Sequence, residues 1–84
     1  MKKIVYFSGE WCAPCKVMLP LVKDVTKKLK VPLEVYDTEK DEDLAIRFNV
    51  VQLPTIIRVV DNQEIERVVG LQPKYAVEKF VSAY

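Results

Sequence analysis

The two cysteines of the chain lie three positions apart, as Cys12 and Cys15, at the junction of an extended segment and a helical one. The preceding stretch "KKIVYFS", Lys2 to Ser8, is β-branched and aromatic and predicts a strand. From Cys12 to about Lys30 the apolar residues recur every three or four positions, which predicts an amphipathic helix. Pro20 lies inside this helix and is expected to kink it.

The rest of the chain predicts three more strands and two more helices. The strands are expected at Val31–Asp37, Thr55–Val60 and Glu64–Val69, and the helices at Asp41–Phe48 and Pro73–Tyr84. Asn49 is suited to end the second helix, and Asp61 and Asn62 suit the turn of a hairpin. The order is βαβα followed by ββα. It predicts an α/β fold with a mixed four-stranded sheet, a right-handed parallel crossover and helices on both faces.

Length and charge exclude several classes of protein. A chain of 84 residues is long enough for one domain. With 13 basic and 12 acidic residues its net charge is +1, which argues against a general nucleic-acid binder. No apolar run approaches the roughly 20 residues that span a bilayer. The run Ile4–Phe7 is too short for the core of a signal peptide, so we expect a chain mature from Met1 in the cytoplasm.

The same composition restricts metal binding. Two cysteines and no histidine supply only half of the four ligands of a structural zinc site. An iron–sulfur cluster held by one chain also needs four ligands, so this chain has too few for it. We therefore predict no metal, although a zinc ion shared across a dimer stays open.

The position of the cysteines suggests redox chemistry. If Cys12 caps the helix, the N–H and S–H of Cys15 point at its sulfur, and these bonds and the helix dipole favour a thiolate. Cys12 would then be the nucleophile and Cys15, one turn deeper, would resolve the mixed disulfide. Pro14 falls in the first turn, where its missing N–H costs little. The alternative is a pair of buried structural thiols.

Several residues at fixed spacings resemble the thioredoxin family. They are "WCAPCK" with Pro20 eight residues after Cys12, and "LPT" with Gly70 sixteen residues after Pro54. The resemblance extends from Lys2 to Tyr84. It implies a minimal thioredoxin fold, with residues 1–84 as a single domain that lacks the first strand and helix of standard thioredoxin. It also implies the activity of a protein dithiol–disulfide oxidoreductase.

The resemblance assigns roles to residues at matching positions. Cys12 attacks and Cys15 resolves, Pro54 is a cis-proline facing them, and Leu53 offers its backbone to an extended substrate. An apolar docking surface is formed by Trp11, Ala13, Pro14 and Gly70. For Trp11 a packed core position is the alternative.

Two departures from the family pattern concern buried charges. Thioredoxins carry a buried aspartate where this chain has Tyr6, and the lysine that accompanies it aligns with Leu33. We therefore predict that the site has no internal carboxylate base and that Tyr6 occupies the buried position as a neutral phenol. Glu10 is the nearest carboxylate in sequence.

The resemblance also implies how the chain is reduced and which proteins it meets. The cysteines carry the electrons, so no cofactor is expected beyond the Cys12–Cys15 disulfide. Partners would be disulfide-containing proteins and thioredoxin reductase or a similar NADPH-linked reductase, acting on a monomer. The alternatives are a glutaredoxin-like reductant coupled to glutathione and a non-enzymatic scaffold subunit. Arg58 is expected on an uncovered sheet face, with its stem packed and its head in water.

Overall fold

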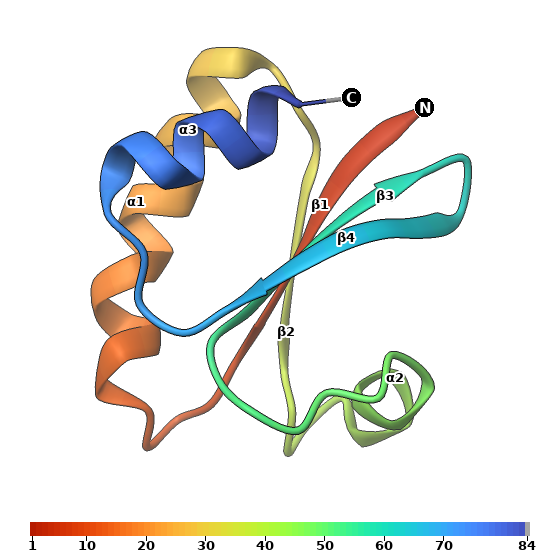
Figure 1. The fold of residues 1–84 in the computed structure, drawn as a ribbon. Coiled ribbons are helices and arrows are strands. Elements are labelled where there is room, and N and C mark those ends of the chain that lie inside the picture. Colours follow the sequence, from red (N-terminus) through yellow and green to blue (C-terminus); the bar gives the residue numbers. More distant parts are fainter. Residues whose placement is uncertain (84) are drawn as a thin grey trace.

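A computed structural model describes residues 1–83 of the chain (Figure 1). It contains four strands and three helices in the order βαβαββα, which matches the expected one. In chain order these are β1 (Lys2–Ser8), α1 (Ala13–Leu29), β2 (Leu33–Asp37), α2 (Glu42–Arg47), β3 (Thr55–Val60), β4 (Gln63–Val69) and α3 (Lys74–Ser82).

The four strands form one mixed sheet in the order β2-β1-β3-β4. β1 pairs with β2 in parallel and with β3 antiparallel, and β4 completes the hairpin with β3. Tyr6 therefore lies mid-sheet, opposite Val35 of β2 and Ile56 of β3. The predicted fold class is confirmed.

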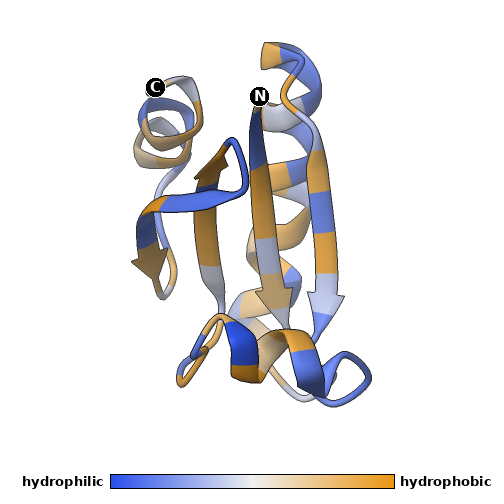
Figure 2. Ribbon diagram, turned by 90° about the vertical axis from the view of Figure 1, so that its right-hand side faces the viewer, coloured by the Kyte–Doolittle hydropathy of each residue, from blue (hydrophilic) through white to orange (hydrophobic). Residues whose placement is uncertain are grey.

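Each face of the sheet has its own apolar cluster. Ile4 and Tyr6 of β1 pack with α1 and α3 on one face, whereas Val5 and Phe7 pack with α2 on the other. This alternation follows from the two-residue period of a strand. Figure 2 shows apolar colour on the central strands, with α1 passing behind the sheet and α2 at its lower end.

Small differences from the expected boundaries have local causes. β2 begins at Leu33 rather than Val31, because Lys30 turns into the left-handed region with φ 58° and the Val31 N–H bonds back to Thr26. Pro73 is the N-cap of α3 rather than a residue of its first turn. The helix α1 continues unbroken through Pro20. The predicted end of the last helix at Tyr84 lies outside the described residues.

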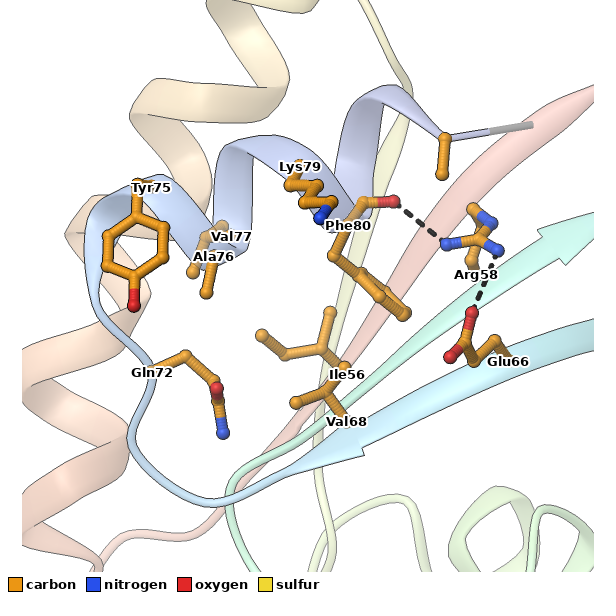
Figure 3. A pocket seen from close by; sticks show the side chains of 11 residues that line it. Ile56, Arg58, Glu66, Val68, Gln72, Tyr75, Ala76, Val77, Lys79 and Phe80 are labelled. Atoms are coloured by element: carbon orange, nitrogen blue, oxygen red, sulfur yellow. Dashed lines mark hydrogen bonds and ion pairs between the residues drawn. The ribbon is translucent and has the colours of Figure 1, made fainter.

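The prediction for Arg58 is wrong. Its side chain lies on the α3 face and is only 5% exposed. The guanidinium donates to the Phe80 carbonyl at 2.9 Å, pairs with Glu66 and stacks over the Phe80 ring. These groups lie at one end of a groove of about 310 Å³ between α3 and β4, whose floor includes Ile56 and Val68 (Figure 3). The bonds to α3 and β4 hold the head in the interior, so it does not reach water.

Candidate active site

The cysteine pair lies at the start of α1. Cys12 is the N-cap, with φ −98° and ψ 101°, and its sulfur accepts the N–H of Cys15 at 3.2 Å. The Cys12 N–H bonds in turn to the Gly9 carbonyl, which forms the turn out of β1. The two cysteines form a disulfide with their Cα atoms 5.2 Å apart. The predicted capping geometry is therefore confirmed.

The surroundings of the pair are asymmetric. Cys15 is fully buried, Cys12 is half-buried, and Ala13 and Pro14 beside it are exposed. Trp11 is 87% exposed, so the alternative of a packed core tryptophan is wrong. An external disulfide can therefore approach Cys12 but not Cys15.

Gly9 contributes to the site in a way that the sequence reasoning missed. A Cβ on this residue would lie 2.8 Å from Leu53 Cδ1 and 3.9 Å from Cys12 Cβ. The absence of a side chain thus lets Leu53 lie beside the first turn of α1. One signal was available, because Gly9 is one of only two glycines in the chain and directly follows a predicted strand.

The Leu53–Pro54 peptide bond is cis, as the resemblance implied. Pro54 is buried, and its carbonyl accepts the N–H of Gly70 at 2.9 Å. Gly70 has φ 92°, a conformation that residues other than glycine rarely adopt. The structure therefore joins the two loops that carry Pro54 and Gly70.

A sulfur contact links these loops to α1. The Gln72 N–H lies 3.2 Å from the Met18 sulfur, and Met18 is one turn beyond Cys15 and fully buried. The sequence pattern assigned Met18 only to the apolar stripe of the helix. Thioethers are weak acceptors that a pattern of hydrophobic positions does not reveal.

Tyr6 lies directly behind the cysteines. Its side chain is fully buried, and its hydroxyl donates to the Cys15 carbonyl at 2.8 Å. Burial raises the pKa of Tyr6 to about 12, so the phenol is neutral at physiological pH. Leu33 packs at the border of the same cluster. No aspartate or glutamate is buried among residues 1–83, and Glu10 is exposed.

The described residues contain neither a cluster of metal ligands nor a helix that could span a membrane. Within residues 1–83, no three histidine, cysteine, aspartate or glutamate side chains gather where they could hold a metal ion. No helix in this part of the chain combines the length and apolar content that crossing a membrane requires.

Known proteins share this arrangement. The family profile described as Thioredoxin matches residues 1–83. The chain belongs to the thioredoxin family. A thioredoxin from Chlamydia muridarum is 34% identical over 82 residues, which cover 96% of this chain and 80% of that protein.

Solved thioredoxin structures have the same fold. A thioredoxin from Schistosoma mansoni superposes with a TM-score of 0.88 at 30% identity, covering 95% of this chain and 75% of that one. A mutant thioredoxin from Halobacterium salinarum gives a TM-score of 0.89 at 26% identity, over 95% of this chain and 71% of its own.

Membership of the family establishes the class of reaction. Thioredoxins are thiol–disulfide oxidoreductases that use no cofactor beyond their redox-active disulfide. The Cys12–Cys15 disulfide is the redox-active CxxC site of this thioredoxin-family chain.

Proposed function

We propose that Cys12 is the attacking cysteine and Cys15 the resolving one in the reduction of protein disulfides. The supporting observation is the hydrogen bond from the Cys15 N–H to the sulfur of a half-buried Cys12 at a helix start. The Cys12 thiolate displaces one sulfur of the substrate as a thiolate and forms a mixed disulfide. The Cys15 sulfur then attacks Cys12, which releases the second substrate thiolate and a proton and leaves Cys12–Cys15 oxidised.

Among residues 1–83, no buried carboxylate can accept the proton that Cys15 loses. Since the neutral Tyr6 hydroxyl is a donor, we propose that the Cys15 proton leaves with the departing substrate thiolate or to water. Glu10 at the surface is a further acceptor for this proton.

We propose a docking surface around Cys12 that consists of Trp11, Ala13, Pro14, Leu53, Pro54 and Gly70. The exposure of Trp11 and the contact of Leu53 with the Gly9 turn support it. Two exposed apolar residues that the sequence reasoning missed extend this surface. Val51 precedes Leu53 and is 84% exposed, and Leu71 follows Gly70 and is 59% exposed. A backbone segment of the substrate would pair beside Leu53 as an added strand.

The remaining assignments extend this proposal. A thioredoxin reductase or a similar NADPH-linked enzyme would reduce the disulfide again, with no bound cofactor, in a cytoplasmic monomer. We also propose that residues 1–84 belong to a single thioredoxin-like domain. In support, the alignments cover 95–96% of this chain and 71–80% of the three relatives.

Insulin reduction tests the function and its alternatives. We expect the reduced chain to precipitate insulin when thioredoxin reductase and NADPH regenerate it. A glutaredoxin-like protein would instead depend on glutathione with glutathione reductase, and a scaffold subunit would act in neither arm. A variant in which Cys12 and Cys15 are both serine is the matched control. Precipitation only in the glutathione arm, or equal to that of the control, would contradict the proposal.

A further inference from the structure

The hydroxyl of Tyr6 connects the centre of the sheet to the resolving cysteine. Tyr6 is held on both sides, because β1 is paired with β2 and β3 at this position. Its hydroxyl bonds to the backbone carbonyl of Cys15 at 2.8 Å, and both side chains are fully buried. The bond therefore joins a strand that is paired on both sides to the first turn of α1.

The chemistry of this group limits what it can do. A phenol whose pKa is about 12 stays protonated over the range in which thiols react, so Tyr6 cannot act as the base for Cys15. It can only donate its proton in a hydrogen bond. Because it bonds to the carbonyl of Cys15 rather than to a sulfur atom, its effect on the reaction must be positional.

The first turn of α1 needs such support. A helix is held by bonds from each N–H to the carbonyl four residues before it. Pro20 has no N–H, so the Lys16 carbonyl lacks its usual helical donor. The turn that carries Cys15 is therefore tied less firmly to the rest of the helix, and the Tyr6 hydroxyl supplies a bond from outside the helix.

Two bonds of the Cys15 backbone to groups outside the helical ladder change differently during the reaction. Its N–H bonds to the Cys12 sulfur at 3.2 Å, and its carbonyl accepts from Tyr6. Hydrogen bonds to a charged acceptor are the stronger ones, so the first bond weakens when the Cys12 thiolate becomes a neutral mixed disulfide. The bond from Tyr6 involves neither sulfur and persists. In the mixed disulfide it therefore still ties the Cys15 backbone to the sheet, beside the bond that the Cys15 carbonyl accepts within the helix.

We propose that Tyr6 is a positioning residue that holds Cys15 for its attack on the mixed disulfide. The inference rests on the proposed resolving role of Cys15. Displacement at sulfur requires the attacking sulfur to lie in line with the bond that breaks, and small misplacements of a reacting group slow such steps strongly. Tyr6 thus acts on the second step of the reaction and not on the first.

The two steps can be followed separately with 5,5′-dithiobis(2-nitrobenzoate) and the reduced protein. Attack by Cys12 releases one coloured thiolate, and resolution by Cys15 releases a second one. We expect Tyr6→Phe, which keeps the ring and removes the hydroxyl, to slow the second release by roughly two- to tenfold, the effect of one lost hydrogen bond. The rate of the first release should not change.

Tyr36→Phe is the matched control. It removes a hydroxyl that bonds to Glu34 at 2.8 Å, and its ring packs in the cluster on the opposite face of the sheet. Neither release should change in this variant. If Tyr6→Phe alone does not fold, the same comparison in a Lys30→Gly background, which relieves a left-handed residue at the far end of α1, applies the test.

The outcomes separate this inference from the proposed function. An unchanged second release in Tyr6→Phe, or an equal slowing of both releases, would overturn the positioning role while leaving the proposed function intact. If the parent protein released only one thiolate, the resolving role of Cys15 would be wrong and this inference with it. A slower second release alone, with Tyr36→Phe at the parent rate, supports Tyr6 as the positioning residue.

Discussion

Cys12 and Cys15 belong to one short motif but have opposite environments. Cys12 is half-buried with its sulfur at a helix start, whereas Cys15 is enclosed in the apolar core. Reactivity of a thiol follows its thiolate character and its access to solvent. The difference between the two sulfurs therefore comes from their positions one helical turn apart.

Alkylation should distinguish the two cysteines. In the reduced protein at neutral pH, iodoacetamide is expected to modify Cys12 well before Cys15, because only Cys12 is accessible. Mass spectrometry of peptides from a short reaction measures the order. In Cys15→Ser, mixed disulfides with substrates should accumulate, whereas Cys12→Ser should form none. Faster labelling of Cys15 would contradict the assignment.

Because the Tyr6 phenol is buried, we expect the protein to lose stability at alkaline pH. Burial raises the pKa of Tyr6 from its ordinary value of 10.0 to about 12, so folding favours the neutral form. The resulting stabilisation is complete below pH 10 and is lost as the pH rises from 10 through about 12. Urea unfolding across this range should show a steeper fall for the parent than for Tyr6→Phe. Equal pH dependence in the two proteins would show that the pKa of Tyr6 is not raised by folding.

At the scale of elements, both ends of α1 are determined by single residues. Cys12 caps the N-terminus through its sulfur, and Lys30 ends the helix in the left-handed region with φ 58°. The N–H groups of Lys30 and Val31 close this end on carbonyls of the last turn. Glycine is the usual residue in this conformation, because a Cβ is strained there.

Lys30→Gly should therefore stabilise the protein. Relief of the left-handed strain is expected to raise the free energy of unfolding by up to about 1 kcal/mol. Lys28→Gly, in the last turn of the same helix, is the matched control and should lower it by about 1 kcal/mol. Urea denaturation of the oxidised proteins measures both. A loss of stability in Lys30→Gly would mean that its side chain contributes more than its backbone costs.

At the scale of the whole molecule, the sheet separates two apolar clusters. The charged residue Arg58 is buried on the face of the sheet that α3 covers. Arg58 joins β3 to the Phe80 carbonyl of α3 and to Glu66 of β4 (Figure 3). Its Nε atom is buried without a hydrogen-bond partner. A buried ion that is only partly satisfied contributes little net stability relative to an apolar side chain of similar size.

Arg58→Met should accordingly change the free energy of unfolding by less than about 1.5 kcal/mol, as an apolar replacement of similar length. Arg58→Ala should lower it by about 2 kcal/mol or more, because it removes a long buried side chain whose guanidinium lies over the Phe80 ring. Glu66→Gln, at the exposed end of the pair, is the control and should cost less than about 1 kcal/mol. Thermal and urea unfolding measure all three. Equal losses in Arg58→Met and Arg58→Ala would show that the charge itself stabilises the fold.

The sequence by itself determined the elements and the chemical identity of the site. Periodicity, local composition and capping signals predicted all four strands and three helices, because each depends on neighbours a few residues away. The capping role of Cys12 was predictable for the same reason, since its partner Cys15 lies within one turn of helix. The neutral buried role of Tyr6 was also predictable, but only from its position relative to Cys12 in the family pattern.

Only the tertiary structure decided which distant residues meet at these positions. The approach of Leu53 to Gly9, the bond from Tyr6 to the Cys15 carbonyl and the contact of Gln72 with Met18 each join separate elements or loops. A pattern of apolar positions states which face of an element is buried, but not which atoms lie across from it. Arg58 illustrates the limit, because a charged residue in a strand predicts a solvated head. A carbonyl of α3 and a carboxylate of β4, both distant in sequence, made burial possible instead.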